Sequence, residues 1–341
     1  MSIPVGIVSW GVYLPPGIET AADIARQSGV PEAVVRDKLG VRQKHVAGPD
    51  DHCAGMAAAA ARQALERARL DAADVDLVVY HGSEHKEHVV WSAATHVQGL
   101  LGCTNAAAFE LYALCAGTPI ALKTARALMR DDRRLKNVML VTASRENDLV
   151  DYTNPRARFM FNFGAGGGAL LLRRDHAENE VLGAAVASDG SLSESVVMPA
   201  GGSREPASVE SVRAGRHRLD VLCLEKMADR LGATSLPRFR AVVEQAVADS
   251  GHGLGDVKLA ALVHMKRSFH DALLRELGLT AEQSVYLDDF GHVQSVDQVL
   301  ALEVASRRGL LRDGELIVLA AAGTGYTWSA AAVRWGRRRE A

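Results

Sequence analysis

Cys115 occupies a position in the chain where a thiol can act as a nucleophile. The mostly small and apolar residues 105–114 favour a buried strand, and residues 117–127 have helical periodicity, so the thiol stands at a strand-to-helix turn. Gly117 permits this turn, and Pro119 is tolerated in the first turn of a helix. Free N–H groups and the positive dipole end at a helix N-terminus stabilise thiolate over thiol. We therefore predict a nucleophilic Cys115 rather than an inert, buried one.

Two histidines in the second half of the chain also stand at strand ends. His264 follows the apolar run 258–263, and His292 follows the short run 285–287 and a glycine. Reactive groups in open α/β sheets typically lie where a strand gives way to a helix. Imidazole can donate a hydrogen bond or accept a proton near neutral pH, so both residues are candidates for acid–base work beside Cys115.

The composition is typical of a soluble enzyme and argues against several other classes. Of 341 residues, 48% are hydrophobic and 23% charged, and the net charge of −2 provides no basic surface for nucleic acid. No apolar run is long enough to span a membrane, and the first residues lack the pattern of a secretory signal, so we expect a cytoplasmic protein. No CxxC spacing occurs among the four cysteines, which argues against a zinc site and a disulfide framework; they are Cys53, Cys103, Cys115 and Cys223.

Apolar runs alternate with helical segments along the whole chain, which indicates an α/β fold. The second half repeats the pattern of the first, so we expect two similar halves, residues 1–175 and 176–341. Strands are expected at residues 5–8, 75–80, 106–112, 138–143, 181–188, 258–263, 285–287 and 315–322, with a last strand that ends at residue 333. Helices are expected at residues 21–27, 32–38, 54–69, 92–101, 219–231, 237–250, 269–277 and 296–307.

Three further histidines could suggest a metal site. His81, His85 and His88 have the i, i+4 and i+7 spacing of one helix face. Gly82 and Ser83 favour a loop there instead, and no carboxylate–histidine signature accompanies the three. We therefore expect no metal site.

Four stretches of the sequence together resemble the β-ketoacyl-ACP synthase III family of the thiolase superfamily. The most specific part is Gly-Leu-Leu-Arg-Asp-Gly-Glu-Leu-Ile-Val-Leu-Ala-Ala-Ala-Gly-Thr-Gly-Tyr-Thr-Trp (residues 309–328), which follows the family's closing pattern of helix, strand, glycine turn and Phe-Thr-Trp. In order and spacing the stretches cover almost the whole chain. They are Leu39–His45, Asn105–Gly117, Ala261–Phe269 and Gly291–Trp335.

The resemblance implies a thiolase-like, five-layered αβαβα fold and a homodimer joined through the strand 106–112. It also implies that an acyl group passes from CoA or acyl carrier protein (ACP) to the Cys and is then attacked by a carbon nucleophile. The expected reaction is decarboxylative condensation with a malonyl thioester, as in a 3-oxoacyl-ACP synthase III. No permanently bound cofactor is expected, because the phosphopantetheine thioester of CoA or ACP is a substrate.

By position in these motifs, the resemblance assigns Cys115 as the nucleophile and His264 as the family's first catalytic His. His292 takes the place of the family's Asn and gives a Cys-His-His set like that of the elongating ketosynthases. It would stabilise an enolate after the acyl group has been loaded. Backbone N–H groups of Cys115, Thr324 and Gly325 would form the oxyanion hole.

Several departures from the family pattern suggest a specialised homologue. Met265-Lys266-Arg267 replaces Gln-Ala-Asn. Arg42, Lys266 and Arg267 are candidates to bind phosphates of CoA or of the carrier's phosphopantetheine, with solvated surface charges as the alternative. Val34 stands where the family has an adenine-stacking Trp. Residues 84–88, in the loop near the acyl pocket, are unusually polar, and residues 159–163 are expected in the core.

Two other functions are compatible with these residues. An acyltransferase of the same fold would pass the acyl group from Cys115 to an oxygen, nitrogen or sulfur acceptor without decarboxylation, with His264 or His292 as general base. A silent subunit of a heteromeric synthase would need no thiol at the start of the helix, so the intact Cys-His-His set argues against it. Release of CO₂ from a malonyl thioester would distinguish condensation from acyl transfer.

Overall fold

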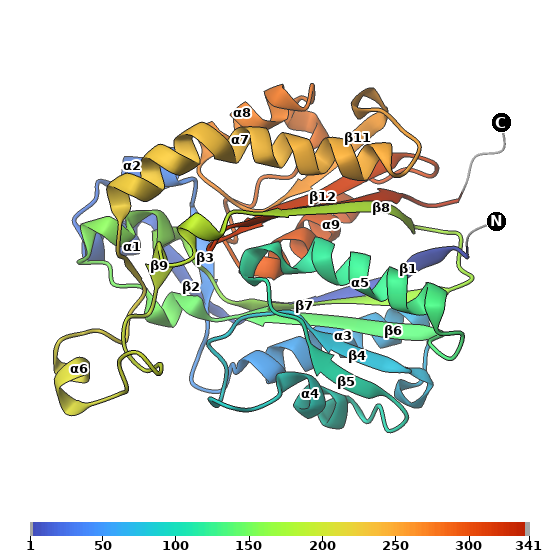
Figure 1. The fold of residues 1–341 in the computed structure, drawn as a ribbon, viewed down its shortest axis with the longest axis horizontal. Coiled ribbons are helices and arrows are strands. Elements are labelled where there is room, and N and C mark those ends of the chain that lie inside the picture. The colour runs from blue at the N-terminus through green and yellow to red at the C-terminus, as the bar shows by residue number, and fades with distance from the viewer. Residues whose placement is uncertain (1–2, 338–341) are drawn as a thin grey trace.

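The computed structural model describes residues 3–337, whose helices and strands form five alternating layers (Figure 1). The large sheet has the strand order β11-β12-β13-β8-β1-β7-β6-β4-β5. Its two parts form separate layers that meet where Gly6 of β1 pairs with Glu180 of β8. Helices lie outside each sheet layer and between the two, so the predicted αβαβα fold is confirmed.

One sheet layer, the lower one in Figure 1, ends at the strand that precedes Cys115. It consists of β1 (Val5–Tyr13), β7 (Gly166–Arg174), β6 (Asn137–Ser144), β4 (Leu77–Tyr80) and β5 (Ala107–Glu110). The upper layer consists of β8 (Glu180–Ser188), β13 (Thr327–Arg334), β12 (Leu316–Gly323) and β11 (Val257–Leu262). Because β4, β5 and β6 run parallel, their carboxyl ends lie at one edge, where the chain turns toward Cys115.

The main helices are divided among three layers. Below lie α3 (Cys53–Ala68) and α4 (Ala93–Leu101), between the sheets α5 (Gly117–Asp131) and α9 (Asp297–Arg307), and above α7 (Leu224–Ala248) and α8 (Arg267–Glu276). Peripheral elements are α1 (Ala21–Ser28), α2 (Glu32–Val34), α6 (Val209–Arg213), the pair β2 (Gly17–Thr20) and β3 (Gln43–Val46), and the pair β9 (Val196–Val197) and β10 (Asp220–Val221). Among residues 3–337, none of the helices combines the length and apolar character that crossing a membrane would require.

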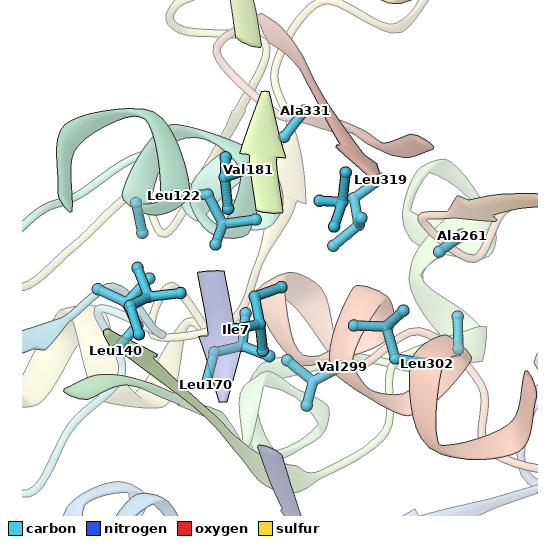
Figure 2. Close-up of a cluster of buried hydrophobic side chains, with 14 of the residues drawn as sticks. Ile7, Leu122, Leu140, Leu170, Val181, Ala261, Val299, Leu302, Leu319 and Ala331 are labelled. Atoms are coloured by element: carbon cyan, nitrogen blue, oxygen red, sulfur yellow. The ribbon is translucent and has the colours of Figure 1, made fainter. Parts of the chain in front are cut away.

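The middle helix layer is the centre of the hydrophobic core (Figure 2). Leu122 of α5 and Val299 and Leu302 of α9 are buried between side chains of both sheet layers. The strand residues around them include Ile7, Leu140, Leu170, Val181, Leu319 and Ala331. Since α5 follows Cys115 directly and α9 begins at Asp297, this core fixes the relative position of both helix starts.

Helix α7 corrects the prediction of two helices at residues 219–231 and 237–250. It runs unbroken from Leu224 to Ala248 with Pro237 inside. Pro237 removes one helical hydrogen bond, but Ala233, whose carbonyl loses its donor, is exposed, so water can replace the missing N–H. Most buried side chains of α7 follow the proline.

Strand β5 corrects the prediction of a buried strand over residues 105–114. It is an edge strand, paired with β4, and Phe109 and Tyr112 are 38% and 54% exposed. The predicted strand 285–287 is also wrong. Ser284 makes an isolated bridge with Ala260, and the residues after it form a loop that leads to His292.

Candidate active site

Cys115 lies in a tight turn between β5 and α5, as its sequence context predicts. Residues Leu114–Ala116 form a 3₁₀ turn that continues directly into α5. Leu114 has a φ of 50°, in the left-handed region that non-glycine residues seldom adopt. The thiol of Cys115 is 5% exposed, lines a cavity and faces His292.

A buried hydrogen-bond chain connects Cys115 through His292 to a carboxylate. The Nε2 atom of His292 lies 3.1 Å from Cys115 Sγ, and its Nδ1–H donates to Asp297 at 2.6 Å. Asp297, the fully buried first residue of α9, also accepts the backbone N–H groups of His264 and Val293, each at 2.7 Å. A carboxylate can only accept, so the proton on Nδ1 leaves Nε2 directed at the sulfur.

The charges around His292 favour its protonated form. Burial alone would lower the pKa of His292, but the Asp297 carboxylate and the Cys115 sulfur outweigh burial and raise that pKa well above its ordinary value. A proton moved from Cys115 to His292 would therefore leave a thiolate–imidazolium pair, with Asp297 stabilising the cation. This arrangement can generate a nucleophile at neutral pH.

His264 lies beside this chain, but its ring is not part of it. Within residues 3–337, neither ring nitrogen of His264 has a hydrogen-bond partner, and the ring centroid lies 4.8 Å from that of Tyr286. Burial, together with His292, His270 and Arg267, lowers the pKa of His264 well below its ordinary value. His264 lines the same cavity as Cys115, so its neutral ring can donate a hydrogen bond to a ligand there.

The end of β12 approaches the nucleophile closely. A Cβ added at Gly323 would lie 3.2 Å from the backbone nitrogen of Cys115, so a larger residue would press on the turn. Thr324 lines the cavity, and Gly325 follows with a φ of 121°, which L side chains rarely adopt. The segment predicted to supply the oxyanion hole therefore lies beside the thiol.

An apolar cavity of about 450 Å³ contains Cys115 and both histidines in its wall, a size within the range of small-molecule sites. Residues on one face of α7 contribute part of the lining: Ala228, Leu231, Gly232, Ser235 and Phe239. The prediction that residues 159–163 lie in the core rather than at a ligand site is correct for Phe161, whereas Phe163 is buried but also lines the cavity. It is wrong for Phe159, which is 37% exposed and lines the cavity.

The three cations expected to bind phosphate differ in their surroundings. Lys266 lines the cavity. Arg42 forms ion pairs with Asp289 at 2.6 Å and with Asp288 at 3.3 Å. Arg267 lies 3.6 Å from the same Asp288 carboxylate. Two of the three predicted phosphate ligands are therefore already paired with carboxylates.

Sequence reasoning missed Asp297, although it completes the hydrogen-bond chain. The available signal was one acidic residue, five positions after His292, in a run of otherwise uncharged residues from 293 to 302. An acidic residue in the first turn of a helix usually interacts with the helix dipole at the surface, so the pattern alone does not indicate burial. Burial results from the position of α9 between the two sheets.

Sequence reasoning also missed Lys44, which is completely buried behind His292. Its ammonium group donates to the carbonyls of Phe161 and Phe163 at 2.8 and 2.6 Å and lies 3.1 Å from the Glu19 carboxylate. Burial lowers the pKa of Lys44 to about 8, although Glu19 acts in the opposite direction. Lys44 fixes the segment whose residue 162 carbonyl accepts the backbone N–H of His292 at 2.8 Å.

The three histidines at positions 81, 85 and 88 have different surroundings. Burial lowers the pKa of His81 to about 3. His85 lies 3.6 Å from the Asp148 carboxylate, and the His88 ring centroid lies 5.5 Å from that of Trp91. Over residues 3–337, no group of three or more His, Cys, Asp or Glu residues is placed to hold a metal ion.

Comparison with known proteins gives matches over the segment that contains Cys115 and over the segment that contains the two histidines. Two family models match: "3-Oxoacyl-[acyl-carrier-protein (ACP)] synthase III" at residues 109–190, which include Cys115, and its C-terminal counterpart at residues 247–335, which include His264 and His292. The beta-ketoacyl-[acyl-carrier-protein] synthase III of Acaryochloris marina (strain MBIC 11017) is 30% identical over 305 residues, 89% of each chain. The protein of the same name from Desulfitobacterium hafniense (strain DSM 10664 / DCB-2) is 29% identical over 340 residues, 98% of this chain and 99% of that one.

Solved structures agree with the fold. The crystal structure of 3-oxoacyl-(acyl carrier protein) synthase III from Pseudomonas aeruginosa PAO1 superposes with a TM-score of 0.84. It is 24% identical, and the match covers 99% of this chain and 100% of that one. The described part of this chain therefore has the same fold as that protein.

Proposed function

The chain belongs to the 3-oxoacyl-[acyl-carrier-protein] synthase III family of acyl-transferring and condensing enzymes, and from this premise we propose that it loads an acyl group from a CoA or ACP thioester onto Cys115. We propose further that the group then passes to an oxygen, nitrogen or sulfur nucleophile without decarboxylation. The observation that carries this proposal is the buried chain of Asp297, His292 and Cys115. Sets of this kind perform acyl transfer on several unrelated folds.

In the loading step, His292 Nε2 accepts the proton of the Cys115 thiol, and the thiolate attacks the carbonyl carbon of the donor thioester. Backbone N–H groups of Cys115 and of the turn at Thr324 and Gly325 stabilise the oxyanion. The bond from this carbon to the donor sulfur then breaks, and His292 returns the proton to the leaving thiol. One thioester replaces another, so no further reactant is needed.

In the transfer step, His292 accepts the proton of the acceptor, which attacks the acyl carbon on Cys115. The bond to Cys115 sulfur breaks, and the sulfur recovers the proton from His292. Asp297 stabilises the cation of His292 and keeps its ring in one tautomer, which is the function of the third member of such a set.

His292 is better suited to this role than to enolate stabilisation. The carboxylate of Asp297 makes the imidazole a strong proton acceptor. An imidazolium beside a malonyl thioester would also stabilise the malonyl carboxylate, whose negative charge decarboxylation must discharge. That stabilisation of the ground state opposes the condensation reaction.

Decarboxylative condensation is the second candidate function, and His264 is the observation in its favour. A neutral imidazole in the cavity wall can donate a hydrogen bond to the enolate formed when a malonyl thioester loses CO₂. The enolate carbon would then attack the acyl group on Cys115. The name of the matched relatives, beta-ketoacyl-[acyl-carrier-protein] synthase III, supports this candidate.

Intact-mass measurement with a panel of acyl-CoA and acyl-ACP thioesters tests the loading step. An acyl adduct is expected on the parent protein and on Cys53→Ala, Cys103→Ala and Cys223→Ala, and no adduct on Cys115→Ala. A stable adduct on Cys115→Ala would refute Cys115 as the nucleophile. Failure of every thioester to label Cys115 would refute the proposal and favour a silent subunit.

The second step is tested on the loaded enzyme. Addition of a malonyl thioester should leave the adduct unchanged and release no CO₂, whereas small alcohols, amines or thiols should remove the acyl group. Release of CO₂ together with a 3-oxoacyl product would establish condensation instead.

We also propose that the protein is a homodimer joined at the edge of β5. The edge is unpaired within the described chain and carries the exposed side chain of Phe109, and the exposed Tyr112 follows two residues after the strand. Sedimentation should give a dimer for the parent protein and a monomer for Phe109→Lys. Ile18→Lys, which changes another exposed apolar strand residue, is the control and should remain dimeric. A monomeric parent protein at micromolar concentration would refute the proposal.

A further inference from the structure

Two buried hydroxyl groups connect the nucleophile segment to the segment that carries His292. The Ser295 hydroxyl donates to the Leu114 carbonyl at 2.5 Å, and the Thr118 hydroxyl donates to the Ser295 carbonyl at 2.5 Å. Ser295 and Thr118 are both 0% exposed. The two hydrogen bonds run in opposite directions between the same two segments, and we call this pair of residues the hydroxyl latch.

The latch is placed where it can control the geometry of the proposed nucleophile. Leu114 and Thr118 flank Cys115, whereas Ser295 lies between His292 and Asp297. The segments are separated by 177 or more positions in the chain, so these contacts and the packing of α5 and α9 set their relative position. The latch therefore joins the two segments that place Cys115 Sγ and His292 Nε2 3.1 Å apart.

The backbone at Leu114 gives the Ser295 hydroxyl a specific task. With a φ of 50°, Leu114 holds a conformation that a non-glycine residue keeps only when surrounding contacts impose it. Its carbonyl accepts the N–H of Gly117 as well as the Ser295 hydroxyl. Removing the hydroxyl would free the turn to relax and carry Cys115 away from His292.

We propose that Ser295 and Thr118 are positioning residues that hold Cys115 in hydrogen-bonding distance of His292. They act on the backbone on both sides of the reacting pair, so they affect thiol activation rather than substrate binding. The inference rests on the proposed role of the Cys115–His292 pair. Its test uses iodoacetamide, which requires neither a thioester nor an acceptor.

The test compares the rate of Cys115 alkylation by iodoacetamide across a pH series, in a Cys223→Ala background that removes the exposed thiol. At about pH 6, where an unpaired thiol is scarcely ionised, Thr118→Val and Ser295→Ala should be alkylated about ten to a hundred times more slowly than the parent. Thr118→Ser, which retains the hydroxyl, should stay within about twofold of the parent. The slow variants should regain reactivity at alkaline pH.

Ser284→Ala is the matched control. Ser284 is also a buried serine, and its hydroxyl donates to the backbone carbonyl of Ala260 at 2.8 Å. Among the described residues, it has no recorded hydrogen bond to the turn that carries Cys115. Its loss should lower the unfolding temperature without changing the pH dependence of alkylation.

Unchanged alkylation in Thr118→Val, or equal slowing in Ser284→Ala, would overturn the proposal. If Thr118→Val does not fold, Ser295→Ala decides in the same way. If Thr118→Val and Ser295→Ala slow alkylation but no acyl thioester labels Cys115, the proposed function is refuted. The positioning role of the two residues would still stand.

Discussion

His264 and His292 are both buried imidazoles in the wall of one cavity, yet their environments differ in almost every other respect. The ring of His292 is engaged on both sides, by Asp297 and by the Cys115 sulfur. The ring of His264 has no hydrogen-bond partner within residues 3–337, and Asp297 binds its backbone instead. The Asp297 carboxylate thus raises the basicity of the His292 ring, whereas at His264 it accepts only the backbone N–H.

This difference shows how one residue type can support two kinds of chemistry in a single site. The pKa of His292 is raised because a carboxylate and a sulfur outweigh burial, whereas burial and nearby cations lower the pKa of His264. The first ring is suited to move a proton, and the second to remain neutral. Pairs of titratable groups whose pKa values are driven apart are typical of acid–base sites.

The largest expected effect follows from removing the ring of His292. His292→Ala should slow acyl loading by about three to four powers of ten, because the thiol loses its proton acceptor. His264→Ala removes the same side chain from the same cavity and should slow loading by less than about tenfold. Both rates come from the time course of intact mass after mixing with an acyl-CoA. Equal losses in the two variants would abolish the distinction between the rings.

Asp297→Asn should convert His292 into a ring more like His264. Without the carboxylate, burial dominates and the pKa of His292 falls, so the neutral ring no longer stabilises a thiolate at neutral pH. Loading should slow by about two to four powers of ten at pH 7 and recover in part as the pH rises. The matched control is Asp288→Asn, which removes a carboxylate that pairs with Arg42. A pH–rate profile unchanged by Asp297→Asn would contradict this account.

Removal of the His264 ring should distinguish the two candidates for the second half-reaction. With preloaded enzyme, His264→Ala should slow transfer to an oxygen, nitrogen or sulfur acceptor by less than about tenfold, since His292 supplies the base. If the acceptor is instead the carbon of a malonyl thioester, the same variant should lose about two to three powers of ten. Quenched time points after addition of each acceptor give the two rates.

The smallest expected effect concerns stability. His264→Leu removes a buried polar ring for which residues 3–337 provide no hydrogen-bond partner, so the free energy of unfolding should stay constant or rise by about 1 kcal/mol. His292→Leu leaves the buried Asp297 carboxylate without its side-chain partner and should lower that free energy by about 3 kcal/mol. Urea denaturation of the two variants measures the difference. Equal losses of unfolding free energy in the two variants would contradict the difference in hydrogen bonding between His264 and His292.

The alternating pattern of the sequence was sufficient to predict an α/β fold, and the family resemblance supplied its five layers. Alternating apolar and helical periodicities record which segments are buried, and strand ends in an α/β fold gather at common edges. Cys115 and His264 were therefore predictable from strand ends, whereas the strand expected before His292 does not form and the family resemblance supported that residue; the structure brings all three to one cavity. The division of the chain at residue 175 stays a prediction.

Features that depend on long-range contacts were not predictable in the same way. The burial of Asp297 depends on the two sheets around α9, and that of Lys44 on carbonyls more than a hundred residues away. Local sequence alone also did not indicate in which half-reaction His292 acts. We expected it to act after loading, as the family's Asn would, whereas its 3.1 Å contact with Cys115 favours a role in loading too.

The segments of helix α7 before and after Pro237 are packed differently. After Pro237, the side chains of Val242, Val243 and Val247 anchor the helix in the body of the protein, whereas most of residues 224–236 are exposed or line the cavity. Because one hydrogen bond between the halves is missing, the first half should open locally. The amide hydrogens of residues 224–236 should exchange with solvent within roughly seconds to minutes. Those after Pro237 should exchange only when the whole protein unfolds. The cavity wall can thus adjust to ligands of different width without disturbing the sheets.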